Sequence, residues 1–269
     1  MSKDNNPTTS HLPEPSKCNP DDIRAYKSIS GQELRAHIFS PENLNKSEKL
    51  PVFVFFHPGG WSMGGPEWGY DICCHYSRLG MVTISFQYRL SSIGGYSPLD
   101  AVWDARSALR WTRQEAAELG IDPNRLVAGG ISAGAHLAAC AAMIPGMDDP
   151  QDNLAFSPVP QALALQSACV NPVIESHFVE LLQNREKPEK LSPAHHVRAG
   201  LPPMCLFHGT ADEIVPYHTV KEFTEKMRGA GNRCDLHSFE GVDHFFMDGS
   251  AQARVPGLIE SFLKSLGYC

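Results

Sequence analysis

Apolar and polar residues alternate in two short segments near the start of the chain. Residues 23–29 follow the two-residue period of a half-buried strand, a Ser-Gly-Gln turn comes next, and a second strand is expected at 34–39. The pattern predicts an antiparallel hairpin at the beginning of the fold.

The strands expected after this hairpin have a different pattern. Residues 52–56 and 81–86 are apolar on both faces, as in strands that helices cover on each side. Further short strands are expected at 126–129, 162–166, 204–208 and 236–239.

Helical spacing of apolar residues appears between these strands. It predicts a long helix over 99–119, which Gly120 ends, and an Ala-rich helix over 132–143. Alternating strands and helices indicate a mostly parallel α/β sheet with helices on both faces. The remaining expected segments are helices at 219–228 and 253–266 and excursions from the core at 147–160 and 183–190.

Length and composition refine this fold class. A chain of 269 residues is of a size that one hydrophobic core supports, so we expect a flexible, polar N-terminal arm, 1–20, and a single domain, 21–269. A net charge of −7 gives no electrostatic footprint for nucleic acid. No run approaches the roughly 18 apolar residues of a membrane span, and the polar N-terminus does not have the pattern of a secretory signal.

The eight cysteines do not follow the spacing of a metal or redox site. Cys73 and Cys74 are neighbours, adjacent cysteines rarely bridge each other, and no CxxC spacing occurs. We therefore expect buried, reduced thiols, a reducing compartment and a cytoplasmic location.

A GxSxG motif at 130–134 follows one expected strand and opens the Ala-rich helix. This is the setting of a nucleophile elbow, a turn so tight that the residues two before and two after the serine must be small. Gly130 and Gly134 meet that requirement, so Ser132 is the candidate nucleophile. A serine that only caps the helix is the alternative.

A second motif, His-Pro-Gly-Gly-Trp at 57–61, also follows an apolar strand. Glycines let the backbone present N–H groups to an oxyanion without a side chain in the way. Pro58 has no N–H group, so the candidate donors are Gly59 and Gly60, joined by Ala133 after the nucleophile. A plain glycine-rich turn is the alternative.

Two more motifs supply a carboxylate and an imidazole. Asp212 lies on the loop after the strand at 204–208, from which it can reach an imidazole beside the nucleophile. Glu213 and, less favoured, Asp243 are the rival carboxylates. His244 follows the last expected strand, so the chain order is Ser, Asp, His, a known order for a catalytic triad.

Together these motifs resemble those of the α/β-hydrolase superfamily, in the group that holds hormone-sensitive-lipase-like esterases and small, nearly capless acetyl xylan and feruloyl esterases. The resemblance covers about residues 50–250 and implies an α/β-hydrolase fold with little or no cap domain. The matching residues are 57–61 for HGGGW, 88–90 for YRL, 130–134 for GxSAG, Asp212 in HGxxDxxVP, and His244.

Some positions depart from this family pattern. Pro58 replaces the first glycine and should stiffen the oxyanion loop. Gln87 replaces the aspartate usual before YRL, and Ser91-Ser92 replace Ala-Pro, which places the chain outside the typical lipase-like branch. Residues expected to hold loops by hydrogen bonds are His57, Tyr88, Arg89, Asp100 and Asp104.

The resemblance implies a serine carboxylesterase that works through an acyl-enzyme, with His244 as base and Asp212 fixing its tautomer. Such an enzyme requires no metal or cofactor. The expected substrate is a small-molecule or carbohydrate ester with a short acyl group, such as an acetylated or feruloylated sugar. Residues expected to line the cleft are Trp61, Ile131, Trp68 and Phe245.

Several interpretations stay open at this point. For Trp61 and Trp68, a buried aromatic anchor is nearly as well supported as a place in the cleft. An aryl formamidase, which cleaves amides of the N-formylkynurenine type, is the alternative enzyme. A non-catalytic receptor on the same fold is disfavoured because such receptors replace the catalytic histidine, whereas His244 is present.

Overall fold

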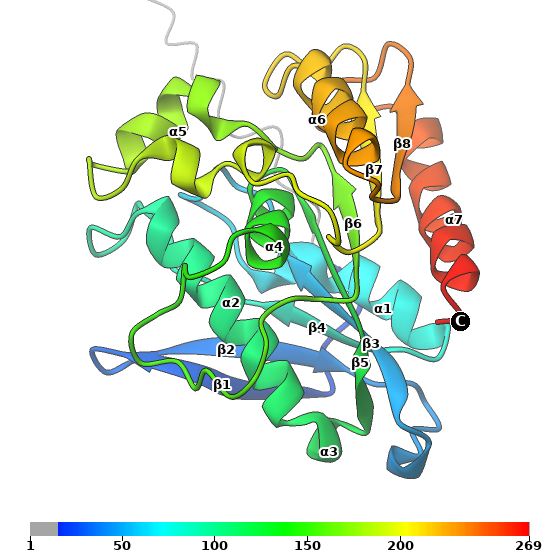
Figure 1. Ribbon diagram of the computed structural model, residues 1–269. Helices are drawn as coiled ribbons and strands as arrows, with labels where there is room; N and C mark the ends of the chain where they lie inside the picture. The colour runs from blue at the N-terminus through cyan, green and yellow to red at the C-terminus, as the bar shows by residue number, and fades with distance from the viewer. Residues whose placement is uncertain (1–15, 269) are drawn as a thin grey trace, which may run out of the picture.

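The computed structural model describes residues 16–268, so the expected arm before Ser16 lies outside the described residues. The strands are β1 (Asp22–Ile29), β2 (Gln32–Phe39), β3 (Leu50–Phe56), β4 (Val82–Phe86), β5 (Ile121–Ile131), β6 (Ala162–Gln166), β7 (Met204–Gly209) and β8 (Cys234–Phe239). They form one eight-stranded sheet in the order β1-β2-β4-β3-β5-β6-β7-β8 (Figure 1). The strand β2 is antiparallel to its neighbours β1 and β4, and the other neighbouring strands are parallel.

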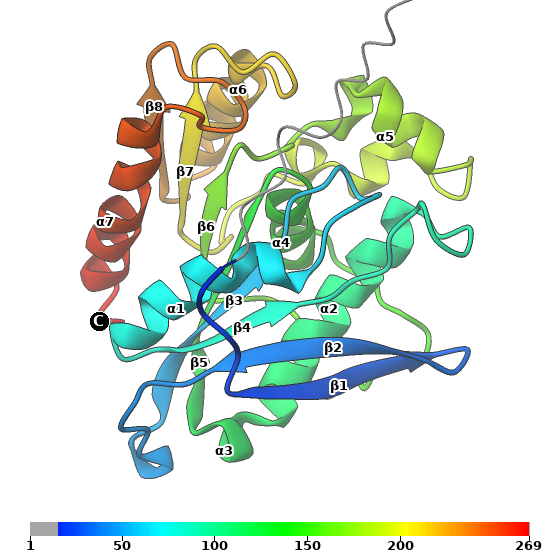
Figure 2. The same cartoon turned by 180° about the vertical axis from the view of Figure 1, so that it is seen from behind.

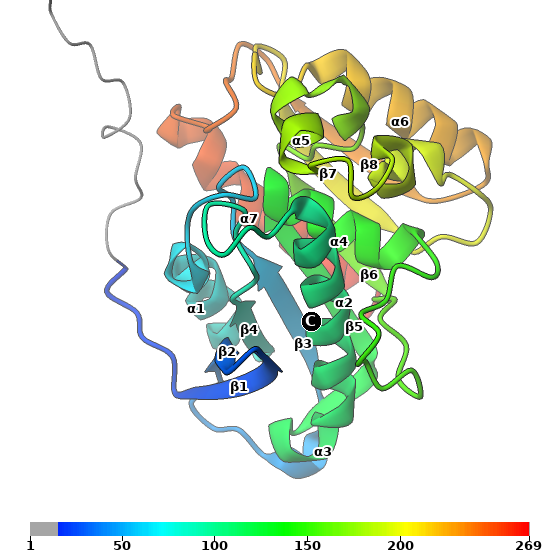
Figure 3. The ribbon, with the colours of Figure 1, turned by 90° about the vertical axis from the view of Figure 1, so that its left-hand side faces the viewer.

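Helices cover both faces of this sheet. The helices are α1 (Tyr70–Arg78), α2 (Pro98–Gln114), α3 (Ala116–Leu119), α4 (Ala133–Met143), α5 (Ser176–Leu181), α6 (Tyr217–Gly229) and α7 (Gly249–Ser265). The helices α2, α4 and α6 pack on one face, and α1 and α7 pack on the other (Figures 1 and 2). Seen edge-on, α1 and α2 lie on opposite sides of the sheet (Figure 3). No helix among residues 16–268 is both long and apolar enough to cross a membrane.

The sheet divides the apolar core into two clusters, and the side chains of β3 alternate between them. Val54 and Phe56 point into the cluster beneath α2 and α4, whereas Phe53 and Phe55 point into the cluster beneath α1 and α7. Because successive side chains of a strand face opposite sides, a strand covered on both faces must be apolar at every position. The unbroken apolar run of β3 therefore follows from its central place in the sheet.

The predicted strands and the opening hairpin are confirmed. The strands β1 and β2 pair in antiparallel register, with Asp22 opposite Ile38. The long helix predicted over 99–119 is wrong near its end, because Glu115 (φ −86°, ψ 10°) leaves helical geometry and separates α2 from α3. The helix α1 was not predicted.

The segment 167–203, between β6 and β7, forms a short insert at the carboxyl edge of the sheet (Figure 1). It contains α5 and the short 3-10 turns Pro172–Ile174, Pro188–Leu191 and Pro193–His195. The predicted excursion at 183–190 lies within this insert. We refer to residues 167–203 as the insert.

The expectation that all the thiols are reduced is wrong for one pair. Cys18 and Cys74, which are 56 residues apart in sequence, form a disulfide with their Cα atoms 6.5 Å apart. Sequence spacing cannot reveal such a contact, because it depends on the N-terminal segment returning to α1. The Ser16 hydroxyl also donates to Asp71, 2.5 Å away in the first turn of α1. The described part of the predicted flexible arm, around Ser16 and Cys18, is therefore fastened to the domain.

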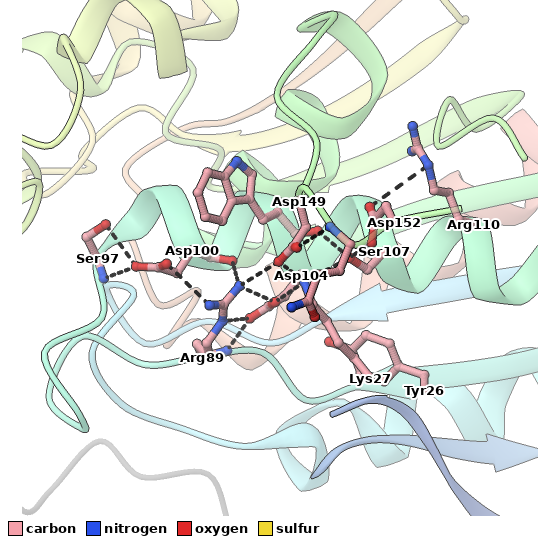
Figure 4. A network of polar contacts seen from close by, with 12 residues as sticks. Tyr26, Lys27, Arg89, Ser97, Asp100, Asp104, Ser107, Arg110, Asp149 and Asp152 are labelled. Carbon is pink, nitrogen blue, oxygen red and sulfur yellow. Dashed lines mark hydrogen bonds and ion pairs between the residues drawn. The ribbon is translucent and has the colours of Figure 1, made fainter. Parts of the chain in front are cut away.

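A buried ionic network joins β1, the loop after β4, α2 and the loop after α4 (Figure 4). Arg89 Nε and Nη2 each lie 2.7 Å from a carboxylate oxygen of Asp104, and Arg89 Nη1 lies 3.3 Å from Asp100. Lys27 Nζ lies 2.8 Å from both Asp104 and Asp149. The contacts confirm the prediction that Arg89, Asp100 and Asp104 hold a loop, here the loop after β4, to the rest of the domain. Removing one partner of such a pair leaves a buried charge uncompensated, which typically costs about 3–5 kcal/mol.

Candidate active site

The turn between β5 and α4 holds Ser132 at the carboxyl edge of the sheet. Ser132 has φ 53° and ψ −118°, a conformation that costs a non-glycine residue about 1–3 kcal/mol and persists only where the surroundings enforce it. Close packing enforces it here, because a Cβ atom at Gly134 would lie 2.0 Å from the carbonyl oxygen of Phe56. The Ser132 N–H group donates to the carbonyl of Gln166 at 2.9 Å. The sequence motif thus forms the sharp turn expected of a nucleophile elbow.

Ser132, His244 and Asp212 come from separate loops and form a chain of hydrogen bonds. Asp212 Oδ2 lies 2.7 Å from His244 Nδ1, and Ser132 Oγ lies 2.9 Å from His244 Nε2. An ionised carboxylate can only accept hydrogen bonds, so we place the imidazole proton on Nδ1. His244 Nε2 then accepts from the Ser132 hydroxyl, and this tautomer is ready to take the serine proton.

The carboxylate of Asp212 is buried but well supplied with donors. It accepts from the N–H groups of Ile214 at 3.0 Å and Val215 at 2.7 Å, and His208 Nε2 lies 3.1 Å from Asp212 Oδ2. Burial alone would raise the pKa of Asp212, but hydrogen bonds from His208 and His244 outweigh burial and hold this pKa well below its ordinary value. Asp212 is therefore ionised at neutral pH.

The rival carboxylates lie elsewhere. Glu213 is exposed, and Asp243 accepts from the backbone N–H of Met247 at 3.1 Å. Of the acids considered from the sequence, Asp212 is the one placed against His244 Nδ1.

Ser167, which sequence reasoning missed, supports the loop that carries His244. Its hydroxyl donates to the carbonyl of His244 at 2.8 Å, and its N–H group donates to the carbonyl of Phe207 at 2.9 Å. Ser167 thereby ties the histidine loop to the end of β7. A serine directly after a strand is too common for the sequence to mark this role.

The loop with the His-Pro-Gly-Gly-Trp motif runs beside the elbow. Gly59 has φ 129°, and a Cβ atom there would lie 2.0 Å from the carbonyl oxygen of Met63. Within residues 16–268, the N–H groups of Gly59, Gly60 and Ala133 have no protein acceptor. These groups therefore remain available to a ligand at the expected oxyanion position.

Residues that depart from the family pattern help to hold this loop. Ser91 donates to the carbonyl of Trp61 twice, from its N–H group at 2.9 Å and from its hydroxyl at 3.1 Å. The Ser92 hydroxyl donates to the carbonyl of Ser62. His57 is buried under Tyr88, with the ring centroids 4.1 Å apart, and the Tyr88 hydroxyl donates to the His57 carbonyl at 2.9 Å. His57 and Tyr88 are thus part of the loop support.

The residues expected to line the cleft occupy different places. Phe245 is 51% exposed, and its ring centroid lies 5.3 Å from that of His244. Trp61 is only 5% exposed, packed against Phe178, and its indole N–H donates to His136 at 3.2 Å. Trp68 lies partly buried beside His57. Ile131 lines a cavity of about 320 Å³ between α1 and α7, whose lining does not include Ser132 or His244.

The insert brings two polar side chains to the site that sequence reasoning missed. His177 Nε2 lies 3.6 Å from the position that a Cβ atom at Gly60 would take. Burial, and after it the negative charge of Asp212, raise the pKa of the Glu175 carboxyl above its ordinary value. Within the described residues, no group of three or more His, Cys, Asp or Glu side chains is arranged to hold a metal ion.

Comparison with known proteins identifies the family. Residues 53–248 match a family of the α/β-hydrolase fold. The match covers most of the chain and includes the elbow, the acid and the histidine. The chain belongs to the α/β-hydrolase family.

Similar proteins are named as esterases. Esterase 2 of Thermogutta terrifontis has a TM-score of 0.89 and 37% identity, over 96% of this chain and 98% of that one. The carboxylesterase NlhH of Mycobacterium tuberculosis is 31% identical over 75% of this chain and 68% of its own length. A probable isoprenylcysteine α-carbonyl methylesterase of Arabidopsis thaliana, ICMEL1, is 28% identical over 78% of this chain and 48% of its length. The chain thus spans about half the length of the first curated relatives that it matches.

Proposed function

We propose that the protein is a serine carboxylesterase with Ser132, His244 and Asp212 as its catalytic triad. The observation that carries this proposal is the hydrogen-bonded chain from Asp212 through His244 to Ser132, with the serine on a strained elbow turn. The esterases with similar sequences and structures support the reaction class.

In the first half of the reaction, Ser132 Oγ attacks the ester carbonyl carbon while His244 Nε2 takes the hydroxyl proton. The carbonyl oxygen becomes an oxyanion, which the N–H groups of Gly59, Gly60 and Ala133 stabilise. When the tetrahedral intermediate collapses, the bond to the alcohol breaks and His244 protonates the departing oxygen. The acyl group then remains bound to Ser132.

In the second half, water takes the place of the alcohol. His244 removes a proton from the water as its oxygen attacks the acyl carbon, and the same N–H groups hold the second oxyanion. Collapse of this intermediate returns the proton to Ser132 Oγ and releases the carboxylic acid. The imidazolium that forms in each half is stabilised by the ionised Asp212.

For the substrate we propose an ester with a short acyl group, with acetyl groups on a hydroxylated or carbohydrate alcohol as the first candidate. The small size of the insert supports a short acyl group, because its helix α5 has only 6 residues and is too short to form a large lid over the site. Thermogutta terrifontis esterase 2 has been described with propionate bound and with butyrate bound.

The experiment that tests this function is hydrolysis of p-nitrophenyl acetate by the wild type and by Ser132→Ala. We expect Ser132→Ala to keep less than about a thousandth of the wild-type activity, because triad residues act as a unit. Ser261→Ala, an exposed serine of α7, is the matched control and should retain full activity. Substantial turnover by Ser132→Ala would refute the proposal. Including N-formylkynurenine in the assay distinguishes an esterase from an aryl formamidase.

A further inference from the structure

Trp61 directly follows the oxyanion donors Gly59 and Gly60 and continues their unusual backbone conformation. The φ angles of these three residues are 129°, 56° and 59°. A positive φ is accessible to glycine but unfavourable for a residue with a bulky side chain, and it persists only where the surroundings enforce it. The backbone of Trp61 therefore needs contacts that hold it, and a change in its φ angle would move the adjoining peptide group of Gly60.

Contacts hold Trp61 at both its carbonyl and its side chain. The carbonyl accepts from the N–H group and the hydroxyl of Ser91. The indole N–H donates to His136 Nδ1 at 3.2 Å, and the two rings meet edge to face with their centroids 5.3 Å apart. Both side chains are buried. Because an indole N–H can only donate, a buried Trp61 requires an acceptor, and His136 supplies it.

A second hydrogen bond fixes the tautomer of His136. His136 Nε2 lies 2.8 Å from the carbonyl of Leu191, in the insert. A carbonyl oxygen can only accept, so Nε2 carries the proton and Nδ1 keeps the lone pair that receives the indole N–H of Trp61. Burial lowers the pKa of His136 from 6.5 to about 4, so the imidazole is neutral at neutral pH. The neutral ring thus has one donor and one acceptor, and each has a partner.

The insert that supplies this carbonyl is fixed to the domain. The ring of Phe178, in α5, is buried with its centroid 4.8 Å from that of Trp61. Arg185 reaches Asp100 at the start of α2, with Arg185 Nη2 3.1 Å from Asp100 Oδ1. The carbonyl of Leu191 is therefore presented from a fixed position.

His136 also belongs to the helix that carries the nucleophile. It lies in the first turn of α4, and its N–H group donates to the carbonyl of Ser132 at 3.0 Å. The hydrogen bond from Trp61 to His136 thus joins the oxyanion loop to the helix that begins at Ser132. Stabilisation of an oxyanion depends on how far the N–H donors lie from the carbonyl that the serine attacks. This hydrogen bond constrains that distance.

We propose that His136 is a positioning residue, which holds the donors Gly59 and Gly60 at the correct distance from Ser132 by fixing Trp61. This inference rests on the proposed esterase function and adds a residue to its machinery. His136 is fully buried, so it acts through Trp61 and not on the substrate. A displaced N–H group stabilises the transition state less well. Loss of the His136 acceptor should therefore lower kcat and leave KM almost unchanged.

The test measures kcat and KM for p-nitrophenyl acetate in variants of this pair. His136→Leu removes the acceptor, and we expect kcat to fall about 10- to 100-fold while KM stays within about twofold of the wild type. His136→Asn places an amide oxygen near the former Nδ1 position, so it can still accept from the indole N–H and should recover most of kcat. Trp61→Phe removes the N–H group but keeps a ring, and should lower kcat as His136→Leu does.

A double variant and a control separate this role from a general effect on packing. The loss in Trp61→Phe/His136→Leu should be no larger than in either single variant, because both changes remove the same hydrogen bond. The matched control is Cys140→Ala, which removes a buried thiol 3.2 Å from His136 Nε2. This change leaves the hydrogen bonds to Trp61 and Leu191 in place and should leave kcat unchanged.

A folded His136→Leu with the kcat of the wild type would refute the positioning role. A loss that His136→Asn does not recover, or that appears in KM and not in kcat, would refute it as well. Should His136→Leu fail to fold, as judged by thermal unfolding, an unchanged kcat in Trp61→Phe refutes the role. In all these cases the esterase function stands, because the wild type is active. A wild type that does not hydrolyse p-nitrophenyl acetate would refute the esterase function, and the positioning role with it.

Discussion

The carboxylate oxygen of Asp212 that meets His244 also meets a second imidazole, that of His208. His208 Nε2 lies 3.1 Å from Asp212 Oδ2 and 2.8 Å from the carbonyl of Val215. A single N–H group shared between these acceptors fixes the acid relative to its own loop. His208 is fully buried, so this arrangement is part of the site rather than a surface contact.

We expect His208→Ala to lower kcat for p-nitrophenyl acetate by about 10- to 100-fold, because a displaced Asp212 no longer aligns His244. His208→Gln places an amide donor near the former Nε2 position and should recover much of the loss. The measurement is kcat and KM for each variant at pH 7.5, with folding checked by thermal unfolding. Equal kcat values for the wild type and a folded His208→Ala would contradict this role.

A second prediction concerns Arg185, which fastens the insert to Asp100. Arg185→Ala should lower the free energy of unfolding by about 1–2 kcal/mol and speed cleavage of the insert by a protease specific for glutamate, at Glu186 or Glu189. The control is Lys190→Ala, which removes an exposed ion pair between Lys190 and Glu186, 3.1 Å apart. This change should lower the free energy of unfolding by less than about 0.5 kcal/mol. The prediction fails if the insert of Arg185→Ala is cleaved no faster than that of the wild type.

The buried imidazoles predict how stability depends on pH. Burial lowers the pKa of both His57 and His136 from 6.5 to about 4. As the pH falls below 6.5, the unfolded chain binds protons at these residues but the folded chain does not. Each histidine therefore lowers the free energy of unfolding by up to about 3 kcal/mol as the pH falls from 6.5 to 4.

Urea unfolding between pH 7 and pH 4.5 tests this dependence. The free energy of unfolding should fall steadily with pH over this range in the wild type. His136→Gln removes one of the two titrating groups and should show a shallower fall, whereas the exposed His218→Ala should follow the wild type. A free energy of unfolding that is flat from pH 6.5 to 4.5 would contradict the prediction.

The sequence predicted those features that depend on local patterns. The unbroken apolar run of β3 indicates a strand covered on both faces, and the small residues around Ser132 indicate the elbow. The carboxylate of Asp212 could be selected because its loop follows β7 directly. Local patterns are sufficient to predict these features because the residues that determine each of them are close together in the sequence.

Features that depend on distant segments meeting were not predictable. The Cys18–Cys74 disulfide requires the N-terminal segment to return to α1. The placement of His177 over Gly60 depends on how the insert folds back across the sheet edge, and nothing in the sequence around His177 distinguishes it from other exposed histidines. The helix α1 was missed because it has only 9 residues, about two and a half turns, which is too short for a clear helical period.

Acyl-chain length gives a further prediction. We expect kcat/KM for p-nitrophenyl esters to be highest between acetate and butyrate and to decline toward decanoate. Each CH₂ group that stays in water forgoes up to about 0.8 kcal/mol of transfer free energy, and the insert, with its short helix α5, is too small to form a large lid that would bury such groups. A maximum at octanoate or longer would contradict the short-acyl proposal.

Covalent labelling identifies the nucleophile itself, and we expect that nucleophile to be Ser132. Paraoxon, an electrophilic organophosphate, is a suitable reagent for an activated serine hydroxyl. Mass spectrometry of the treated protein and of its peptides locates the modified residue, with activity followed in parallel. We expect one diethylphosphoryl group, on Ser132, to appear at the rate at which activity is lost, and no label on Ser132→Ala. Loss of activity with Ser132 unmodified, or an equal label on Ser132→Ala, would contradict Ser132 as the nucleophile.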